Sequence, residues 1–432
     1  MSALPSEKAP GDRKQAPARN LPLILLSIAV QAVLGLLFGH IYDVRIFMAT
    51  GYLVATGQNP YLPRDLSAVF HNPAFQNITT VGYPPPWPLV LGAIYRGSYA
   101  ILPNFLAYNL AIKIPIIAAN VGLAYLAAAL IRRLGADAAA ARKAWIFVLL
   151  NPFLLYASAA WGQFDSIVAL LALSALLLLD SGKIKSSAIL LALAISFKPT
   201  ALSLIPVAFF YLKGKSSLQT FKYYGILLTG LLLFSVAPFF IFRWDPGPIL
   251  QNWNAHFVVG GGLSFMTFLE LARDSYRLAG IWWLAGWLWI PALGLAAWSM
   301  RAGIVDFADL LKKSAALILV FFLTRAWVSE PNIILILPFV LILASVGELD
   351  RRALSAIWVL PLIFSFFNTA TAQLFFPSLP VIMDKMLKLA EAYRTVGLVA
   401  KLLIVVPWQA AGWWIVLHCL RRRLAPPARP TS

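Results

Sequence analysis

The sequence predicts an all-α fold, a polytopic bundle of transmembrane helices. Of its 432 residues, 60% are hydrophobic and only 12% are charged, whereas soluble globular chains carry about a quarter charged residues. Long apolar runs follow one another along the chain, and small groups of basic residues separate them, as the positive-inside rule produces. We therefore attribute the net charge of +18 to membrane topology and reject nucleic-acid binding.

The first apolar run, Leu21–Gly39, follows a short basic tail at residues 1–20. At about 1.5 Å per residue it is long enough to cross the hydrocarbon core of a bilayer. It lacks the small-residue cleavage site of a signal peptide, so we expect a first anchor with a cytosolic N-terminus. The single Cys419 excludes a disulfide within the chain.

A long polar stretch, His40–Trp87, follows this anchor and opens a large first outer loop at residues 40–103. Asp43 lies where the chain leaves the bilayer. Tyr83-Pro84-Pro85-Pro86-Trp87 closes the stretch with a rigid turn, because each proline fixes its own φ and restricts the residue before it. Two interpretations of Asp43 stay open: an acid of an active site, or the N-cap of a helix that begins at Val44.

The next apolar stretch, Pro88–Leu102, is expected to lie at the membrane interface or to re-enter the membrane. If it crossed the bilayer, the basic groups that follow it would all lie outside. Ser187–Leu212 is expected to form two short helices that fold back at Lys198-Pro199, because a single helix would likewise export the three lysines that follow it. The other expected spans are Phe105–Ile131, Ala144–Ala160, Phe164–Asp180, Tyr223–Phe242, Ile281–Ser299, Lys312–Val328, Pro331–Val346, Ala353–Thr369 and Val396–Leu420.

This path gives about twelve crossings or near-crossings in a single domain, residues 21–424, with a cytosolic tail at residues 425–432. Several separate turns then place polar residues on the outer face. These residues are Asp43, Tyr83, Gln163, Asp165, Lys198, Arg325, Glu330 and Asn332. Ionisable side chains at membrane depth are costly and usually face a cavity, so this grouping indicates a functional site. The alternative for each residue is a helix cap or a contact between helices.

Taken together, these residues resemble the GT-C superfamily of membrane glycosyltransferases. The matching marks, within His40–Leu335, are Asp43, Tyr83-Pro84-Pro85, Gly162-Gln163-Phe164, Phe197-Lys198, and Glu330 before Ile333-Ile334-Leu335. Their order and spacing are similar to those of glucosyltransferases that use dolichyl-phosphate glucose and of mannosyltransferases that use polyprenyl-phosphate mannose. The chain departs from the glucosyltransferase pattern at Ser329-Glu330-Pro331, where that pattern has His-Glu-Lys.

The resemblance implies transfer of a hexose from a polyprenyl-phosphate donor to a lipid-linked or glycan acceptor, with inversion, at the outer or lumenal face. Asp43 would be the general base, and the seven other residues would bind the substrates. A departing lipid phosphate gathers negative charge, which Lys198 and Arg325 would stabilise. No cofactor and no metal are expected. The membrane would be the plasma membrane in a prokaryote and the endoplasmic reticulum in a eukaryote.

The main alternative is a secondary transporter or lipid flippase with its site at the broken helix around Lys198. Transporters usually show internal repeats and keep short loops, whereas no repeat is evident here and the first loop is long. A third interpretation, a non-catalytic scaffold, would not need acids and cations gathered on one face.

The predicted topology can be tested with single cysteines in a Cys419→Ser background. A cysteine at position 137 should react with an impermeant maleimide only after the membrane is opened, because the basic groups around this position place it inside. The measurement is labelling of intact and permeabilised cells. Labelling of position 137 in intact cells alone would contradict the topology.

Overall fold

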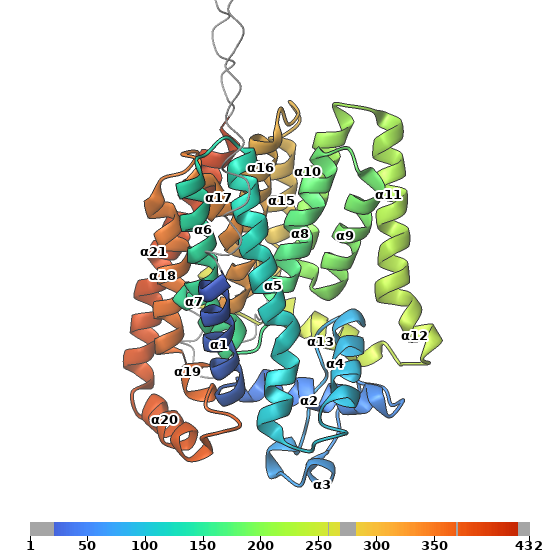
Figure 1. Cartoon of the computed structure of the whole chain (residues 1–432), viewed down its shortest axis with the longest axis vertical. Helices are drawn as coiled ribbons and strands as arrows, with labels where there is room; N and C mark the ends of the chain where they lie inside the picture. Colours follow the sequence, from blue (N-terminus) through green and yellow to red (C-terminus); the bar gives the residue numbers. More distant parts are fainter. Residues whose placement is uncertain (1–20, 258, 268–281, 369, 422–432) are drawn as a thin grey trace, which may run out of the picture.

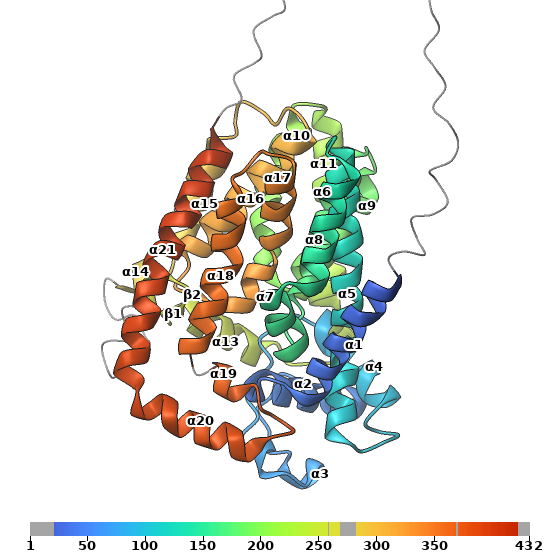
Figure 2. The ribbon, with the colours of Figure 1, turned by 60° about the vertical axis from the view of Figure 1, so that its left-hand side comes forward.

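The computed structural model describes residues 21–257, 259–267, 282–368 and 370–421. In these residues the chain forms a bundle of mostly long, roughly aligned helices, and the predicted all-α class is confirmed (Figures 1 and 2). The expected tails at residues 1–20 and 425–432 lie outside the described residues. Helix α2 lies across one end of the bundle, which we call the α2 end; the opposite end is the far end.

The first half of the chain forms helices close to the expected spans. Their bounds are α1 Leu21–Leu37, α2 Ile41–Ala55, α3 Ser67–Phe70, η1 Pro73–Phe75, α4 Pro86–Gly97, α5 Phe105–Arg133, α6 Ala138–Leu150, α7 Pro152–Leu154, the π-helix η2 Leu155–Ala160, α8 Asp165–Asp180, α9 Ile184–Phe197, η3 Pro199–Leu204 and α10 Ile205–Lys213.

The second half continues the bundle and ends on a long helix. Its elements are α11 Ser217–Leu231, the π-helix η4 Leu232–Val236, α12 Ala237–Ile241, α13 Gly247–Phe257, β1 Gly261–Gly262, α14 Trp282–Ala285, α15 Trp289–Trp298, α16 Phe307–Thr324, β2 Trp327–Val328, η6 Glu330–Ile334, α17 Leu337–Ser345, α18 Arg351–Phe367, α19 Ala370–Gln373, α20 Pro380–Ala392 and α21 Arg394–Leu420.

Among the residues that the structure describes, four helical segments are long and apolar enough to cross a membrane. They are Phe105–Arg133, Ala138–Ala160, Ser217–Ile241 and Arg394–Leu420. Shorter apolar helices pack between them, among them α1, α9 and α15. Helix α4 has 12 residues and lies beside α2 (Figure 1). At about 18 Å it is too short to cross a hydrocarbon core of about 30 Å.

The chain reverses at Lys198, as the sequence predicts. Helix α9 ends at Phe197, and η3 begins at Pro199, which has no N–H to continue the helix. Helix α10 then runs back toward the far end, where the Tyr211 hydroxyl donates to Oδ1 of Asp180, the last residue of α8, at 2.7 Å. Lys198 therefore stands at the tip of a helical hairpin that points toward the α2 end.

The structure corrects several boundaries. Helix α6 begins at Ala138 rather than Ala144, and α11 begins at Ser217 rather than Tyr223. The described part of the expected span Ile281–Ser299 is divided between the short helices α14 and α15.

The sequence predicts a span that begins at Lys312, but α16 begins at Phe307 and buries both Lys312 and Lys313. The Asp306 side chain caps this helix by accepting from the Asp309 N–H, which starts it five residues earlier. Lys312 pairs with Glu348 at 3.1 Å, and Lys313 donates to carbonyl oxygens at the end of α21.

Helix α5 carries a stripe of buried polar side chains at helical spacing: Asn109, Lys113 and Asn120. Asn109 donates to the carbonyls of Gly35 and Phe38 at 2.8 Å each, and Asn120 bonds Gln31 and Ser158. The ammonium group of Lys113 contacts three carbonyl oxygens, those of Gly35, Phe38 and Ala160. The stripe therefore joins the end of α1 to the end of η2.

A short parallel pairing lies near the α2 end. Gly261 pairs with Trp327 and Gly262 with Val328, so β1 rests against the segment that follows α16. A Cβ at Gly262 would lie 2.2 Å from the Val328 carbonyl oxygen, and φ there is +66°. Both facts require glycine at this position.

Lys113→Met should lower the free energy of unfolding by about 1–3 kcal/mol, because it removes a charged donor from three buried carbonyl oxygens, of which those of Gly35 and Phe38 keep Asn109 and that of Ala160 does not. Thermal unfolding of the purified protein in detergent measures the effect. Lys143→Met is the matched control, since Lys143 is exposed near the start of α6 and should change stability by less than about 0.5 kcal/mol. Equal midpoints for the two variants would contradict a stabilising role for Lys113.

Candidate active site

The candidate site is built around one turn, Trp161–Asp165, between η2 and α8. Gly162 adopts φ +98°, a left-handed conformation that favours glycine. A Cβ there would lie 3.0 Å from Cε of Lys113, so the turn rests on the buried lysine. Phe164 stacks on Trp87 with ring centroids 4.3 Å apart, which attaches the first loop to the same turn.

Asp43 faces this turn from the first turn of α2. Its Oδ2 accepts a hydrogen bond from the indole N–H of Trp161 at 2.6 Å, and the Gln163 side chain also bonds the carboxylate. The helix begins at Ile41, after His40, and shows no side-chain cap bond. The interpretation of Asp43 as the N-cap of a helix beginning at Val44 is therefore wrong, and the carboxylate is held by tertiary contacts.

These contacts keep Asp43 ionised. Burial by itself raises the pKa of Asp43, but contact with His40 and the hydrogen bonds from Trp161 and Gln163 outweigh it. The net pKa lies below the ordinary value of 3.8. Asp43 therefore carries a negative charge at neutral pH and can accept a proton.

Gln163 joins Asp43 to Tyr83. The Tyr83 hydroxyl donates to Oε1 of Gln163 at 3.2 Å, and the ring packs against Phe164 at 4.8 Å. Burial, and secondarily the charges of Asp43 and Asp165, raise the pKa of Tyr83 well above its ordinary value. Tyr83 therefore remains a neutral hydrogen-bond donor.

Lys198 and Asp165 form a buried ion pair beside Tyr83. The Lys198 ammonium donates to both carboxylate oxygens at 2.8 Å, and the two side chains are 8% and 1% exposed. Asn332 also hydrogen-bonds Asp165. The ammonium lies 5.4 Å from the centre of the Tyr83 ring and 5.5 Å from that of Phe164, within cation–π range. Six of the eight predicted residues are thus linked: Asp43, Tyr83, Gln163, Asp165, Lys198 and Asn332.

Glu330 lies on another side of Trp161. Its Oε1 accepts from the amide of Asn368 at 2.9 Å, and it interacts electrostatically with His40 and with Tyr156, whose ring packs edge-on against Trp161. Glu330 is 2% exposed and belongs to the same region through these aromatic neighbours.

Arg325 is not joined to the other seven residues. Its guanidinium lies over the Phe321 ring at 4.8 Å, and no carboxylate of the described residues forms a salt bridge with it. Its backbone carbonyl accepts from Ser264 at 2.6 Å. Within the described chain Arg325 is therefore a partly buried cation without an acidic partner, unlike Lys198.

The sequence did not single out three residues on which the site depends. His40 and Trp161 hold Asp43, and Lys113 supports the Gly162 turn. A lysine in an otherwise apolar 29-residue helix, with Asn109 and Asn120 on the same face, is the signal that could have identified Lys113.

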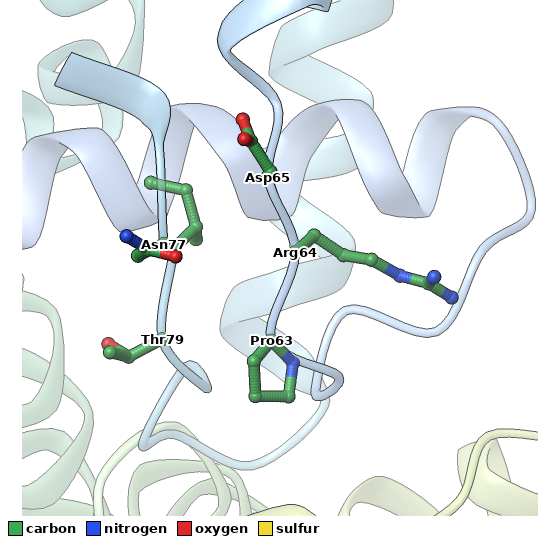
Figure 3. A pocket seen from close by; sticks show the side chains of 6 residues that line it. Pro63, Arg64, Asp65, Asn77 and Thr79 are labelled. Atoms are coloured by element: carbon green, nitrogen blue, oxygen red, sulfur yellow. The ribbon is translucent and has the colours of Figure 1, made fainter. Parts of the chain in front are cut away.

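The surface beyond α2 carries a shallow hollow of about 310 Å³ between residues 63–65 and 77–79 (Figure 3). The backbones of Arg64 and Ile78 pair across it, and the Arg64 side chain points away from Asn77 and Thr79. Tyr42, next to Asp43, contacts Thr79 at 3.3 Å, but none of the eight predicted residues lines the hollow.

No group of three metal-ligating side chains occurs in the part of the chain that the structure describes.

The arrangement places a charged carboxylate, a neutral hydroxyl and a buried cation in one network at one end of the bundle. Such a set can take a proton from a bound hydroxyl group and can stabilise a developing anion nearby.

No protein-family model matches the chain, and no curated protein is significantly similar to it. The chemistry of the site therefore has to be argued from its geometry.

The buried Lys198–Asp165 pair leads to a specific prediction about the free energy of unfolding. Lys198→Met alone should cost about 3–5 kcal/mol, because it leaves the Asp165 carboxylate buried without its cation. Adding Asp165→Asn should recover most of that loss, since no charge then remains. Chemical or thermal unfolding of both variants is the measurement. Arg133→Met, which removes the more exposed pair with Asp180 at the far end, should cost less than about 1 kcal/mol. A double variant as unstable as Lys198→Met would refute this account.

Proposed function

We propose that this chain is a multi-pass membrane glycosyltransferase that transfers a hexose from a polyprenyl-phosphate donor, with inversion, to a lipid-linked or glycan acceptor. The observation that carries the proposal is Asp43, an ionised carboxylate joined through Gln163 and Tyr83 to the Lys198–Asp165 pair. The resemblance of the same residues to GT-C enzymes supports it, since these separate marks of the sequence meet in one place.

In the proposed reaction Asp43 takes the proton of the acceptor hydroxyl. The oxygen attacks the anomeric carbon, a new glycosidic bond forms, and the bond from that carbon to the phosphate oxygen breaks. The lipid phosphate leaves with the electron pair of the broken bond. A positioned base is needed because a sugar hydroxyl is a poor nucleophile at neutral pH.

Two cations with different surroundings would bind the donor's phosphate group and stabilise its charge. Arg325 has no acidic partner among the described residues, and its planar guanidinium can bind two phosphate oxygens. Lys198 is held by Asp165, which keeps the ammonium in place over Tyr83. We assign Arg325 the first contact with the phosphate, and Lys198 the stabilisation of charge as it develops. Tyr83, Gln163, Glu330 and Asn332 would orient the sugars.

The long apolar helical segments support the membrane part of the proposal. Large apolar side chains face outward along Ser217–Ile241; Phe221 and Phe240 are each 78% exposed, as in a bilayer-facing helix. We propose twelve crossings or near-crossings with both termini in the cytosol. The α2 end, with the site, then faces the outside of a prokaryotic plasma membrane or the lumen of the endoplasmic reticulum.

A second candidate function is transport, by a secondary transporter or lipid flippase. The broken helix at Lys198 favours it, because transport sites often lie where half-helices meet. The two functions differ in which residue is essential. A transporter of this design depends on Lys198, whereas the transferase depends on Asp43.

Asp43→Asn tests the proposed function. Asparagine keeps the shape of the side chain but cannot take the acceptor's proton, so turnover should fall by about 10²–10⁴-fold. The assay is transfer of labelled sugar from polyprenyl-phosphate mannose or polyprenyl-phosphate glucose to octyl mannoside, octyl glucoside and extracted membrane lipids. Protein level and unfolding midpoint are measured in parallel.

Asp65→Asn is the matched control, because Asp65 is an exposed acid of the same loop whose carboxylate bonds only Ser67. It should keep full turnover. A stable Asp43→Asn variant with near-normal turnover would remove Asp43 as the base. Absence of transfer by the unmodified protein, together with substrate flux into vesicles that Lys198→Met abolishes, would favour transport.

A further inference from the structure

Helix α20, Pro380–Ala392, lies at the α2 end and is amphipathic. Figure 2 shows it running across this end of the bundle, transverse to α21. Its inner face packs against the protein through Met383, which is buried, and Leu387, which contacts the main core. Its four charged side chains are all exposed: Asp384, Lys385, Lys388 and Glu391. The helix is therefore attached to the bundle along one side only.

A third part of the α20 surface is apolar and yet exposed. Ile382, Leu389 and Tyr393 are 41%, 58% and 61% exposed. Because the second and third of these residues follow the first by seven and eleven positions, all three fall within about 40° of one another around the helix axis, beside the inner face. A contiguous apolar patch of this kind marks a surface that meets something other than water.

The exposed apolar patch of α20 continues into the outward face of α21. Tyr393 ends α20, and α21 begins at Arg394. Val396, Val399 and Leu403 follow at helical spacing, and all three are exposed on a helix that is long and apolar enough to cross a membrane. With α21 across the bilayer, as proposed above, its outward face meets lipid. The adjoining patch of α20 then lies where the hydrocarbon of the outer leaflet ends.

Residues 374–378, which we call the connecting segment, join α20 to the part of the chain that carries Asp43. The Gly39 N–H donates to the Leu374 carbonyl at 2.7 Å. Leu374 also packs against Trp161, whose indole N–H holds the Asp43 carboxylate. A movement of α20 is therefore transmitted to the two chain segments that position this carboxylate.

We propose that α20 is an in-plane membrane helix that binds the outer leaflet through Ile382, Leu389 and Tyr393, and that the connecting segment thereby holds Asp43 at the level of the membrane interface. The two aliphatic side chains enter the acyl boundary, the tyrosine hydroxyl stays among the headgroups, and the charged face meets water. The two lysines and two acids of α20 balance in charge, so the helix binds the hydrocarbon boundary without a need for anionic lipid. The proposal rests on the membrane placement above and not on sugar transfer.

Fluorescent labels test the lipid contact without any need for activity. Leu389→Cys, Asp384→Cys and Leu403→Cys, each in the full-length Cys419→Ser protein, carry an environment-sensitive NBD label in phosphatidylcholine vesicles. Lipids with a doxyl quencher near the carbonyl end or near the middle of the acyl chain report depth, and iodide on both sides of the membrane reports water. The label at position 389 should be quenched best by the shallow doxyl group, that at 384 by iodide, and that at 403 by the deep doxyl group.

Three results would overturn the proposal. A label at Leu389 that iodide reaches and doxyl lipid does not would place α20 in water. A label at Leu389 that is shielded from both quenchers would mean that protein, such as a second copy of the chain, covers the patch. A label at Leu403 that doxyl lipid does not reach would remove the membrane placement itself, and the proposal with it.

Hydrogen exchange tests the role of the connecting segment. Ile382→Glu combined with Leu389→Glu should release α20 from lipid and speed amide exchange at Gly39 about tenfold or more, the equivalent of one or two aliphatic side chains that are no longer buried. Lys385→Glu combined with Lys388→Glu introduces the same two acids on the charged face and should leave this exchange unchanged. Mass spectrometry of both double variants in vesicles is the measurement, and equal exchange at Gly39 would overturn the anchoring role.

These experiments are independent of the proposed reaction. An unmodified protein that transfers no sugar removes the glycosyltransferase, while the labels still decide whether α20 binds lipid. A label at Leu389 that lies in water, with the label at Leu403 in lipid, removes the in-plane helix and leaves Asp43→Asn as the test of the base.

Discussion

The candidate site depends on one buried ammonium group. Lys113, which is fully buried, contacts carbonyl oxygens at the end of α1 and at the end of η2. Both are helix C-termini, where unpaired carbonyls carry partial negative charge, so a cation stabilises them together. The chain leaves α1 into His40 and Asp43, and leaves η2 into Trp161. Fixing these two ends therefore sets the distance between the carboxylate and the indole that holds it.

The sequence predicts the helices well because hydropathy and length determine them locally. Within the described residues nine expected spans correspond to helical segments, whereas Ile281–Ser299 is divided between two short helices, and the reversal at Lys198 follows from charge and proline. The sequence also predicts that Gln163, Asp165 and Lys198 lie at the same end of the bundle, since the predicted topology alone places them there. It could not join Trp161 to Asp43, because that contact spans 118 residues and depends on how two helix ends meet. For the same reason Arg325 was expected beside Lys198, whereas no contact joins them.

The two cations of the site illustrate how burial and pairing set different roles. Lys198 lies at the tip of a hairpin, and a carboxylate satisfies two of its three N–H groups. Such a buried pair fixes the positions of its two side chains more than it stabilises the fold. The cost of desolvating both charges offsets much of their attraction. Arg325 rests on an aromatic face and is partly exposed. An anionic ligand that approaches Lys198 must compete with Asp165, whereas at Arg325 it competes with no carboxylate of the described residues.

The π-helix η2 links the geometry of the site to the count of residues between α6 and α8. A π-helical turn holds one more residue than an α-helical turn, so η2 behaves as a single-residue insertion within Ala138–Ala160. Removing one residue from this segment would restore α-helical winding and rotate Trp161 by about 100° around the axis. The indole would then leave Asp43 although no side chain of the site had changed. Sequence length in this segment is consequently as much a constraint on the site as the identity of its residues.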